Sequence, residues 1–281
     1  MKIIEPSVEL WEQGDNSIAH VTRCARVCYG KESGNDEVLY NNLIKNKHWS
    51  MFRHDSVYAI IPTNDIKSMW SLVMTTYLKC PYIHWITFNN NLYIVTNGNF
   101  LLDVEKENPV LYKWLVKYRV TFKEFKEKAT HYEIKELFRY TFHIGTQRIT
   151  SSDTNRSSPN NIAERSTRWI NFEKRDGGIK ICKFEHYDEL PKEIQDRFVA
   201  KWKEEEELYR DIVNAGFPVD IARHALSFPL ATQCVYTYSV KEWRHFIDNR
   251  YYGATGKPHD DYKLIAGMIR DKLIELGYEF R

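Results

Sequence analysis

The sequence predicts a mixed α/β fold formed by a single domain of residues 1–281. Segments with apolar residues at helical spacing alternate with short runs of β-branched and aromatic residues. Neither an internal repeat nor a long polar linker divides the chain. Hydrophobic residues make up 43% and aromatic residues 14% of the 281 residues, which is sufficient for an ordered core. This intermixing of helices and strands is typical of an α/β-type domain.

The elements of the first half follow from local patterns. The β-branched run 56–61 predicts a strand that ends at Pro62. Strands at 85–88 and 92–95 are expected to form a hairpin through Asn89-Asn90-Asn91. Apolar residues that recur every three or four positions predict the helices of this half, at residues 16–29, 36–45, 65–79 and 108–128.

In the second half, the longest helical pattern covers residues 191–215 and ends at Gly216 and Pro218. The residues expected on its inner face are Ile194, Phe198, Trp202, Leu208 and Ile212. Trp202 and Trp243 are both expected in the core. Strands are expected at 137–144 and 179–184, and further helices at 219–226, 240–249 and 260–276.

The charge balance argues against a general nucleic-acid partner. Lys plus Arg number 40 and Asp plus Glu 38, so the net charge is only +2 and any anion must be bound by a local group of residues. The first residues lack the apolar segment of a signal peptide, and no run of 18 apolar residues predicts a membrane helix. These patterns predict a cytoplasmic protein with neither a nucleic-acid nor a membrane partner.

The five cysteines are scattered and odd in number, which predicts reduced thiols. Cys24 and Cys28 are four residues apart and would share one face of a helix. Because none of the spacings matches a known zinc motif, we interpret the cysteines as structural and predict no metal site.

A polar segment near the middle of the chain is the first candidate site. Glu164-Arg165-Ser166-Thr167-Arg168-Trp169 places two hydroxyls and a guanidinium within three consecutive residues, beside one carboxylate. An arginine can bind two phosphate oxygens while serine and threonine hydroxyls bind the others. The segment follows residues 150–161, which are almost wholly Ser, Thr, Asn, Asp and Arg. On spacing alone, an exposed polar loop explains it better than a phosphate site.

Three other segments combine residues that are able to bind a nucleotide. They are His48-x-Ser50-x-Phe52-x-His54 before a strand, Ala222-Arg223 with Arg250 near helix ends, and the turn-rich Gly253 to His259. Each also has a plainer interpretation. The arginines can offset a helix dipole or pair with acids, the histidines of the first segment can be structural, and His259 can be a turn or capping residue.

Together, these segments resemble the flavin-dependent thymidylate synthases, especially the longer bacterial and phage-like members. The resemblance runs from Met1 almost to the C-terminus and implies a central, mostly antiparallel sheet with long helices. The matching motifs, in order, are Arg26-Val-Cys-Tyr29, His48 to His54, Glu164-x-Ser-Thr-Arg-Trp169, Ala222-Arg223 with Trp243-Arg-His-Phe-x-Asp-x-Arg250, and Gly253-x-Thr-Gly-Lys-Pro-His259.

The resemblance implies an enzyme that makes dTMP from dUMP. Methylenetetrahydrofolate would give the carbon, reduced FAD the hydride, and NADPH would restore the flavin. The family works as a homotetramer with active sites between subunits and uses no cysteine nucleophile. Activation of the pyrimidine would instead be electrostatic.

Roles for single residues follow from the resemblance by position. The residues assigned to the substrate phosphate are Ser166, Thr167, Arg168 and Arg223. Glu164 would lie beside the nucleotide sugar. Arg250 would face the pyrimidine carbonyls and stabilise negative charge on the ring, which makes it the expected catalytic residue. The residues implied in flavin binding are Cys28, Ser50, Ser239 and His245.

The sequence departs from the family where the flavin should bind. The family's Arg-His-Arg signature aligns without a gap with Arg156-Ser157-Ser158, so Arg156 alone is kept and is expected to contact both substrate and flavin. A gapped alternative uses Thr146-Gln147-Arg148 but needs a long insertion. Arg53 also replaces a glutamate of the family. Because serines cannot replace two charges or a stacked ring, flavin binding is expected to be weakened. Residues 149–155 are expected to form a loop, since Ser, Thr and Asn disfavour a helix interior.

Three functions therefore remain open. The first is a thymidylate synthase-like enzyme acting on dUMP or a close pyrimidine deoxynucleotide. The second is a diverged pyrimidine hydroxymethylase, which delivers the carbon without the hydride. The third is a non-catalytic paralogue that binds the nucleotide or pairs with a true synthase.

Overall fold

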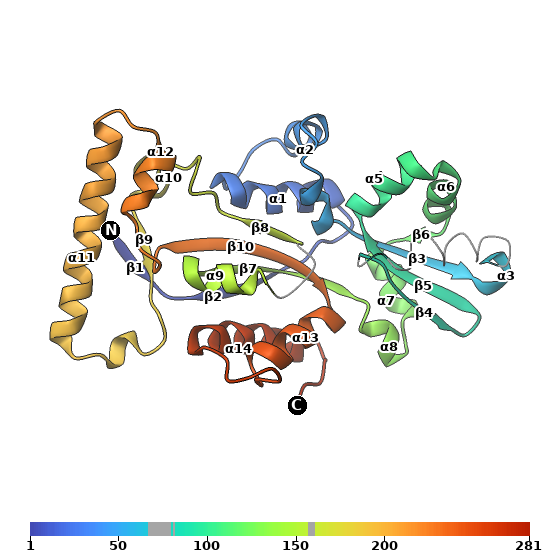
Figure 1. Ribbon diagram of the computed structural model, residues 1–281. Helices are drawn as coiled ribbons and strands as arrows, with labels where there is room; N and C mark the ends of the chain where they lie inside the picture. Colours follow the sequence, from blue (N-terminus) through green and yellow to red (C-terminus); the bar gives the residue numbers. More distant parts are fainter. Residues whose placement is uncertain (67–79, 81, 157–160) are drawn as a thin grey trace.

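The computed structural model describes residues 1–66, 80, 82–156 and 161–281, and it has the predicted mixed α/β architecture (Figure 1). Two four-stranded antiparallel sheets lie side by side, and a short parallel pair of strands forms a third sheet. Helices cover both faces of each four-stranded sheet. Of the helix expected at 65–79, only its first residues are described, within α3 (Thr63–Ile66); the remainder lies outside the described residues.

The central sheet has the strand order β2-β7-β10-β8. Its strands are β2 (Ser7–Trp11), β7 (Arg139–Gln147), β8 (Ile162–Glu164) and β10 (Ala231–Ser239). Helix α1 (Ser17–Tyr29) covers one face, and α13 (Val240–Arg250) and α14 (Asp260–Glu275) cover the other (Figure 1). Strand β10 was not predicted. Most of its residues are buried on both faces, so it lacks the polar–apolar alternation of a half-exposed strand.

The second sheet has the order β4-β5-β3-β6 and confirms the predicted hairpin. The strands are β3 (Ser56–Pro62), β4 (His84–Phe88), β5 (Asn91–Asn97) and β6 (Arg119–Val120). Between β4 and β5, Asn89 and Asn90 have φ angles of 46° and 59°, the left-handed conformation that a tight hairpin turn requires. The covering helices are α5 (Gly98–Glu107), α6 (Pro109–Lys117), α7 (Phe122–Lys128) and α8 (Tyr132–Lys135).

The single helical region expected at 108–128 was wrong, because α6 and α7 are separated by β6. Arg119 and Val120 pair with β3 and so leave the helical path. Thr121 then starts a new helix: its hydroxyl accepts the Glu124 N–H at 3.1 Å, and the Glu124 carboxylate accepts the Thr121 N–H at 2.8 Å. This reciprocal capping box fixes the start of α7.

The loop expected at 149–155 was also wrong, since α9 (Arg148–Thr154) is helical. The hydroxyls of Ser152 and Thr154 donate to backbone carbonyls three or four residues earlier, and that of Ser151 lies 2.9 Å from the Arg148 carbonyl and 2.6 Å from the Glu164 carboxylate. Thr150, Ser151 and Thr154 are buried against the sheet rather than exposed in a polar loop. Tertiary burial thus overrides the weak helix propensity of these residues.

The third sheet joins β1 (Lys2–Ile4) to β9 (Lys180–Cys182) beside the long helix α11 (Lys192–Asn214). Trp202 is buried as predicted, but Ile194 and Leu208 are 38% and 50% exposed, which corrects their predicted inward placement. Glu206 and Tyr209 are buried on the inner face instead. The elements around it are α10 (Phe172–Asp176), α12 (Val219–Ala222) and the 3-10 helices η2 (Tyr187–Glu189) and η3 (Arg223–Ala225).

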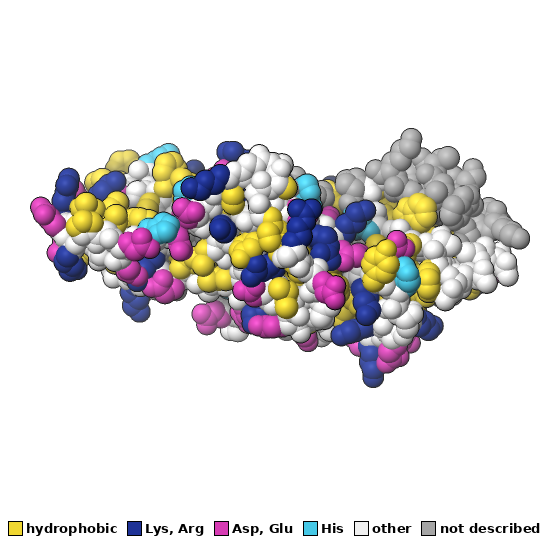
Figure 2. Space-filling view, turned by 90° about the horizontal axis from the view of Figure 1, so that it is seen from below, with side chains coloured by type: hydrophobic (Ala, Val, Ile, Leu, Met, Phe, Trp, Pro, Cys, Tyr) yellow, Lys and Arg dark blue, Asp and Glu magenta, His cyan; other side chains and the backbone are white. Residues whose placement is uncertain are grey.

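The cysteines, the helix lengths and the surface charge can each be compared with the predictions from the sequence. All five cysteines are free thiols. No helix in the described part of the chain is long and apolar enough to span a membrane. Seen from the side of α13 and α14, the surface mixes acidic and basic side chains (Figure 2), in keeping with the net charge of +2. That the chain folds as one domain stays a prediction.

Arg139, at the start of β7, joins the two large sheets. Its buried guanidinium donates to the carbonyls of Asp55 and Thr96 at 3.1 and 3.0 Å, and to those of Arg53 and Thr237 at 2.7 and 3.2 Å. These carbonyls belong to β5, to β10, and to the 3-10 helix η1 (Trp49–His54) and the residue after it. Four segments of the chain therefore meet at one side chain, namely β7, β5, β10 and η1 with the residue after it.

A buried chain of polar groups lies next to Arg139. The His20 ring contacts the Thr141 hydroxyl at 3.0 Å, Thr141 contacts Thr237 at 2.7 Å, and Thr237 contacts the His54 ring at 2.8 Å. Burial, with Arg23 and Arg139 adding to it, lowers the pKa of His20 to about 4. Burial also lowers the pKa of His54 to about 3. Both rings are therefore neutral at pH 7.

We expect the two histidines to make the protein acid-sensitive. Below pH 6.5, an unfolded histidine takes up a proton that the folded ring cannot accept until about pH 4. Stability is thus complete above pH 6.5 and falls as the pH decreases, by about 2 kcal/mol per histidine at pH 5. Urea unfolding at pH 7.5, 6.0 and 5.0 measures this loss. His20→Gln/His54→Gln should flatten the pH dependence, and an unchanged slope would contradict the assignment.

Replacing Arg139 by methionine should destabilise the fold strongly. Arg139→Met removes a donor from four carbonyls, of which that of Asp55 also accepts the Gly98 N–H, and we expect a loss of at least about 3 kcal/mol. Arg210→Met is the matched control, because Arg210 forms an exposed ion pair with Glu173 and its loss should hardly shift the midpoint. Urea midpoints at pH 7.5 compare the two. Equal losses would mean that the junction is not the stabilising feature inferred here.

Candidate functional site

The segment that follows β8 is fixed by two backbone hydrogen bonds. The Arg165 N–H donates to the Gln233 carbonyl of β10 at 2.9 Å, and the Ser166 N–H donates to the Cys28 carbonyl at 3.1 Å. The first bond extends the pairing of β8 with β10, and the second ties the segment to the C-terminal end of α1. The candidate phosphate residues therefore begin at a defined position in the fold.

Four residues expected to bind the phosphate lie together in the structure. The Ser166 hydroxyl accepts the Arg168 N–H at 3.1 Å, and the Arg223 guanidinium of η3 donates to the Thr167 hydroxyl at 3.3 Å. Arg168 is exposed and its guanidinium lies 5.6 Å from the centre of the Trp169 ring. We call Ser166, Thr167, Arg168 and Arg223 the phosphate cluster. Two guanidiniums and two hydroxyls form a chemically suitable group for a phosphate monoester.

Glu164 points to the opposite side of β8 and binds partners within the chain. Its carboxylate is 2.7 Å from Arg148 and accepts the hydroxyls of Ser151 at 2.6 Å and Thr232 at 3.0 Å. Arg148 also donates to the Arg165 carbonyl at 3.3 Å. Ser151, Thr232 and Arg148 were not predicted as site residues. The only signal for Arg148 was the gapped alignment of Thr146-Gln147-Arg148.

Arg156 lies just after the end of α9 and is turned to solvent. Its side chain is 77% exposed and lies 3.3 Å from Asp153, one helical turn earlier. The other two residues of the aligned triplet, Ser157 and Ser158, lie outside the described residues. Of the two alignments, it is the gapped one that puts an arginine, Arg148, next to Glu164.

Cys28 lies at the end of α1, next to Glu164 and Ser166. Burial raises the pKa of its thiol to about 11, and the nearby Glu164 carboxylate contributes to the rise. The thiol is therefore protonated at neutral pH and is a poor nucleophile. This fits a site in which Cys28 has a structural rather than a covalent role.

The other residues expected against a flavin differ in their exposure within one chain. Ser50 is exposed on η1, and His245 is exposed on α13, 3.0 Å from Asn249. Ser239 is fully buried and caps α13: its hydroxyl accepts the Glu242 N–H at 3.2 Å and donates to the Glu242 carboxylate at 2.9 Å. The flavin roles of Ser50, Ser239 and His245 stay predictions.

Arg250 ends α13 and belongs to the layer of α13 and α14 (Figure 1). Its guanidinium lies 5.7 Å from the centre of the Tyr262 ring of α14. The phosphate cluster instead lies between the end of α1 and η3. The structure therefore places the expected catalytic arginine and the expected phosphate residues in different layers of the chain.

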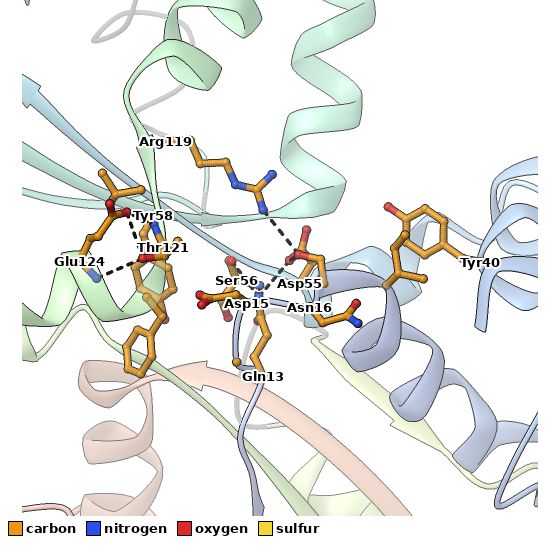
Figure 3. A pocket seen from close by; sticks show the side chains of 15 residues that line it. Gln13, Asp15, Asn16, Tyr40, Asp55, Ser56, Tyr58, Arg119, Thr121 and Glu124 are labelled. Carbon is orange, nitrogen blue, oxygen red and sulfur yellow. Dashed lines mark hydrogen bonds between the residues drawn. The ribbon is translucent and has the colours of Figure 1, made fainter. Parts of the chain in front are cut away.

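A cavity of about 630 Å³ lies between the start of α1 and the second sheet (Figure 3). Burial raises the pKa of Asp55 at its base, where Ser17 and Gln13 donate to the carboxylate. The acidic residues of its lining are Asp15, Asp55 and Glu124, and the one basic residue is Arg119. Because this balance disfavours an anion, the cavity is not a good candidate for the nucleotide phosphate.

Two solved structures of a UMP/dUMP methylase, PolB from Streptomyces cacaoi, were found, one bound with 5-Br UMP and one with 5-Br dUMP. They are 12% and 13% identical with TM-scores of 0.44 and 0.45, and they cover 98% of this chain and 92% and 93% of their own. At these values they say nothing about the substrate of this chain.

No curated protein sequence matches the chain. The model of the thymidylate synthase complementing protein family matches residues 107–275, which is more than half of the sequence and includes the phosphate cluster. The chain belongs to the thymidylate synthase complementing protein family.

Proposed function

We propose that the protein is a thymidylate synthase-like enzyme that acts on dUMP or a close pyrimidine deoxynucleotide. The single observation that supports this most strongly is the phosphate cluster, in which residues from two distant segments meet. Family membership supports a nucleotide methyltransferase. The expected co-substrates are methylenetetrahydrofolate, reduced FAD and NADPH.

In this proposal the phosphate cluster anchors the nucleotide. Arg168 and Arg223 bind the phosphate oxygens, and Ser166 and Thr167, whose hydroxyl oxygens accept from Arg168 and Arg223, donate their O–H groups to the phosphate. Glu164 acts as a positioning residue: by holding Arg148, which binds the Arg165 carbonyl, it fixes the backbone just before Ser166. The two arginines offset the charge of the phosphate locally. Local binding is needed because the net charge of the protein is too small to attract an anion in general.

Arg250 is proposed to stabilise negative charge that develops on the pyrimidine ring. Since Arg250 and the phosphate cluster lie in different layers of one chain, we propose that a homotetramer brings them together from different subunits. The same assembly is proposed to supply the side chains that a flavin needs, because Ser239 is buried and bonded to Glu242 within the chain while Ser50 and His245 are exposed.

A pyrimidine hydroxymethylase is the second candidate. The observation that favours it is Arg156, which is turned to solvent and paired with Asp153 at the position where the family holds its flavin. Weak flavin binding would leave the transferred carbon unreduced, at the hydroxymethyl level. The nucleotide half of the site is the same in both candidates.

Loss of either arginine of the phosphate cluster should weaken dUMP binding. We expect Arg168→Ala and Arg223→Ala each to reduce the affinity by roughly 10- to 100-fold, the effect of a charge-assisted hydrogen bond. Calorimetric titration with dUMP measures the change. Arg210→Ala serves as the control, because its exposed ion pair with Glu173 lies outside the cluster. Unchanged affinity in both test variants would show that the nucleotide binds elsewhere.

The product formed from dUMP and methylenetetrahydrofolate distinguishes the candidate functions. With reduced FAD present, we expect mass spectrometry to detect a methyl product and the purified protein to show flavin absorbance. A hydroxymethyl product from a protein that stays colourless after gel filtration would favour the second candidate. Binding of dUMP without any product would contradict both and point to a non-catalytic paralogue.

A further inference from the structure

A second cavity, of about 590 Å³, lies on the α1 side of the central sheet. Arg165 lines it, together with Trp11 and Val27, which belong to the apolar cluster beneath α1. Glu164, one residue earlier, faces α9 on the other side of β8. Side chains of adjacent strand residues point to opposite faces, so this cavity is separate from the Glu164 network.

The lining of this cavity is strongly basic. Five cationic side chains are present and one carboxylate, that of Glu32. The cationic residues are Arg23, Arg26, Lys31, Arg165 and Lys180. They come from α1, from the turn after it, from the segment after β8 and from β9. A concave surface lined by one sign of charge raises the local concentration of ions of the opposite sign.

Only part of this charge is balanced within the protein. Arg26 is paired with Asp36 at 2.5 Å. Arg23 and Glu9 are 3.6 Å apart and both largely exposed, so this pair is weak. In the described part of the chain, Lys31 and Lys180 form no ion pair. The cavity therefore keeps an excess of positive charge.

The aromatic groups of the cavity are already in contact with protein side chains. The Arg23 guanidinium lies 3.8 Å from the centre of the Trp11 ring, and the His143 ring stacks on Trp11 at 4.5 Å. Burial lowers the pKa of His143 despite the nearby Glu9, so the ring is neutral at pH 7. Since Trp11 already has two partners, the cavity favours recognition of phosphate groups over stacking with a base.

Gly30 allows Arg165 to lie at the end of α1. It has a left-handed φ of 59°, and a Cβ atom there would lie 3.2 Å from the Arg165 guanidinium and 3.0 Å from Ile170. A larger residue would strain the turn and crowd the guanidinium. The turn after α1 thus brings Lys31 and Arg165 to the same cavity.

From these observations we propose that the cavity binds a polyphosphate chain, either inorganic or carried by a nucleotide. Guanidinium groups bind phosphate oxygens in pairs, and the ammonium groups of Lys31 and Lys180 act as further point charges. The volume accommodates several linked phosphates, and their combined charge matches that of the lining better than a single phosphate does. Arg165 directly precedes Ser166, so an occupant here shares a backbone segment with the phosphate cluster. This proposal does not depend on the nucleotide substrate.

The test is calorimetric titration of the full-length protein with pyrophosphate, tripolyphosphate and ATP. We expect Lys31→Gln/Lys180→Gln to weaken pyrophosphate binding at least tenfold. Lys203→Gln/Lys241→Gln, which removes the same charge from exposed positions outside the cavity, should leave the affinity unchanged. Arg168→Ala/Arg223→Ala, which removes the arginines of the phosphate cluster, should also leave it unchanged.

Three results would overturn the proposal. They are no binding of pyrophosphate or tripolyphosphate, equal weakening in the two lysine pairs, and loss of binding when the phosphate cluster is altered. ATP and tripolyphosphate are expected to bind with similar affinity, because the phosphate chain is the part recognised. Binding of ATP that is more than about tenfold tighter would contradict recognition through the phosphates alone.

Discussion

The buried guanidinium of Arg139 holds together the parts of the chain on which the candidate site depends. It donates to four backbone carbonyls, which belong to η1, the residue after η1, β5 and β10. A buried charge is stable in such a place only when its donors are satisfied, and the four carbonyls accomplish this. The neutral pair His20 and His54 fits beside it, because a second positive charge there would be unfavourable.

Contacts of η1, α1 and β10 connect this junction to the candidate site. The η1 segment packs against α1 through Val21, Ala25 and Phe52, which form one apolar cluster. The end of α1 then presents the Cys28 carbonyl to the Ser166 N–H, and β10 presents the Gln233 carbonyl to the Arg165 N–H. The position of the phosphate cluster is therefore set by main-chain contacts of the central sheet and α1. Of its arginines, Arg168 is exposed, and Arg223 donates to the Asp220 carbonyl and the Thr167 hydroxyl.

Glu164 and Arg165 follow each other in the sequence, but their side chains lie on opposite faces of the central sheet. Glu164 belongs to a network with Arg148 on the α9 side, and Arg165 belongs to the basic cavity on the α1 side. The sequence suggested that Glu164 to Arg168 form one anion-binding group. Because side chains alternate between the two faces of a strand, Glu164 and Arg165 instead lie on opposite sides of the sheet. Only Ser166 to Arg168, beyond the end of β8, lie together with Arg223. The first part of the polar tract, up to Thr154, is a helix whose buried hydroxyls face Glu164 or their own backbone.

The sequence by itself determined the features that depend on neighbours along the chain. These include the mixed α/β class, the long helix α11 and the hairpin turn at Asn89 and Asn90, because periodicity and turn chemistry are local. Motif order also singled out Ser166, Thr167, Arg168 and Arg223, which lie together in the structure, and their phosphate-binding role stays a prediction. Tertiary structure alone decided that β10 is a central strand, that residues 148–154 are helical, and that Arg148 rather than Arg156 meets Glu164. These outcomes arise from burial and from contacts between distant segments, whose energies outweigh the weak local preferences that a sequence reveals.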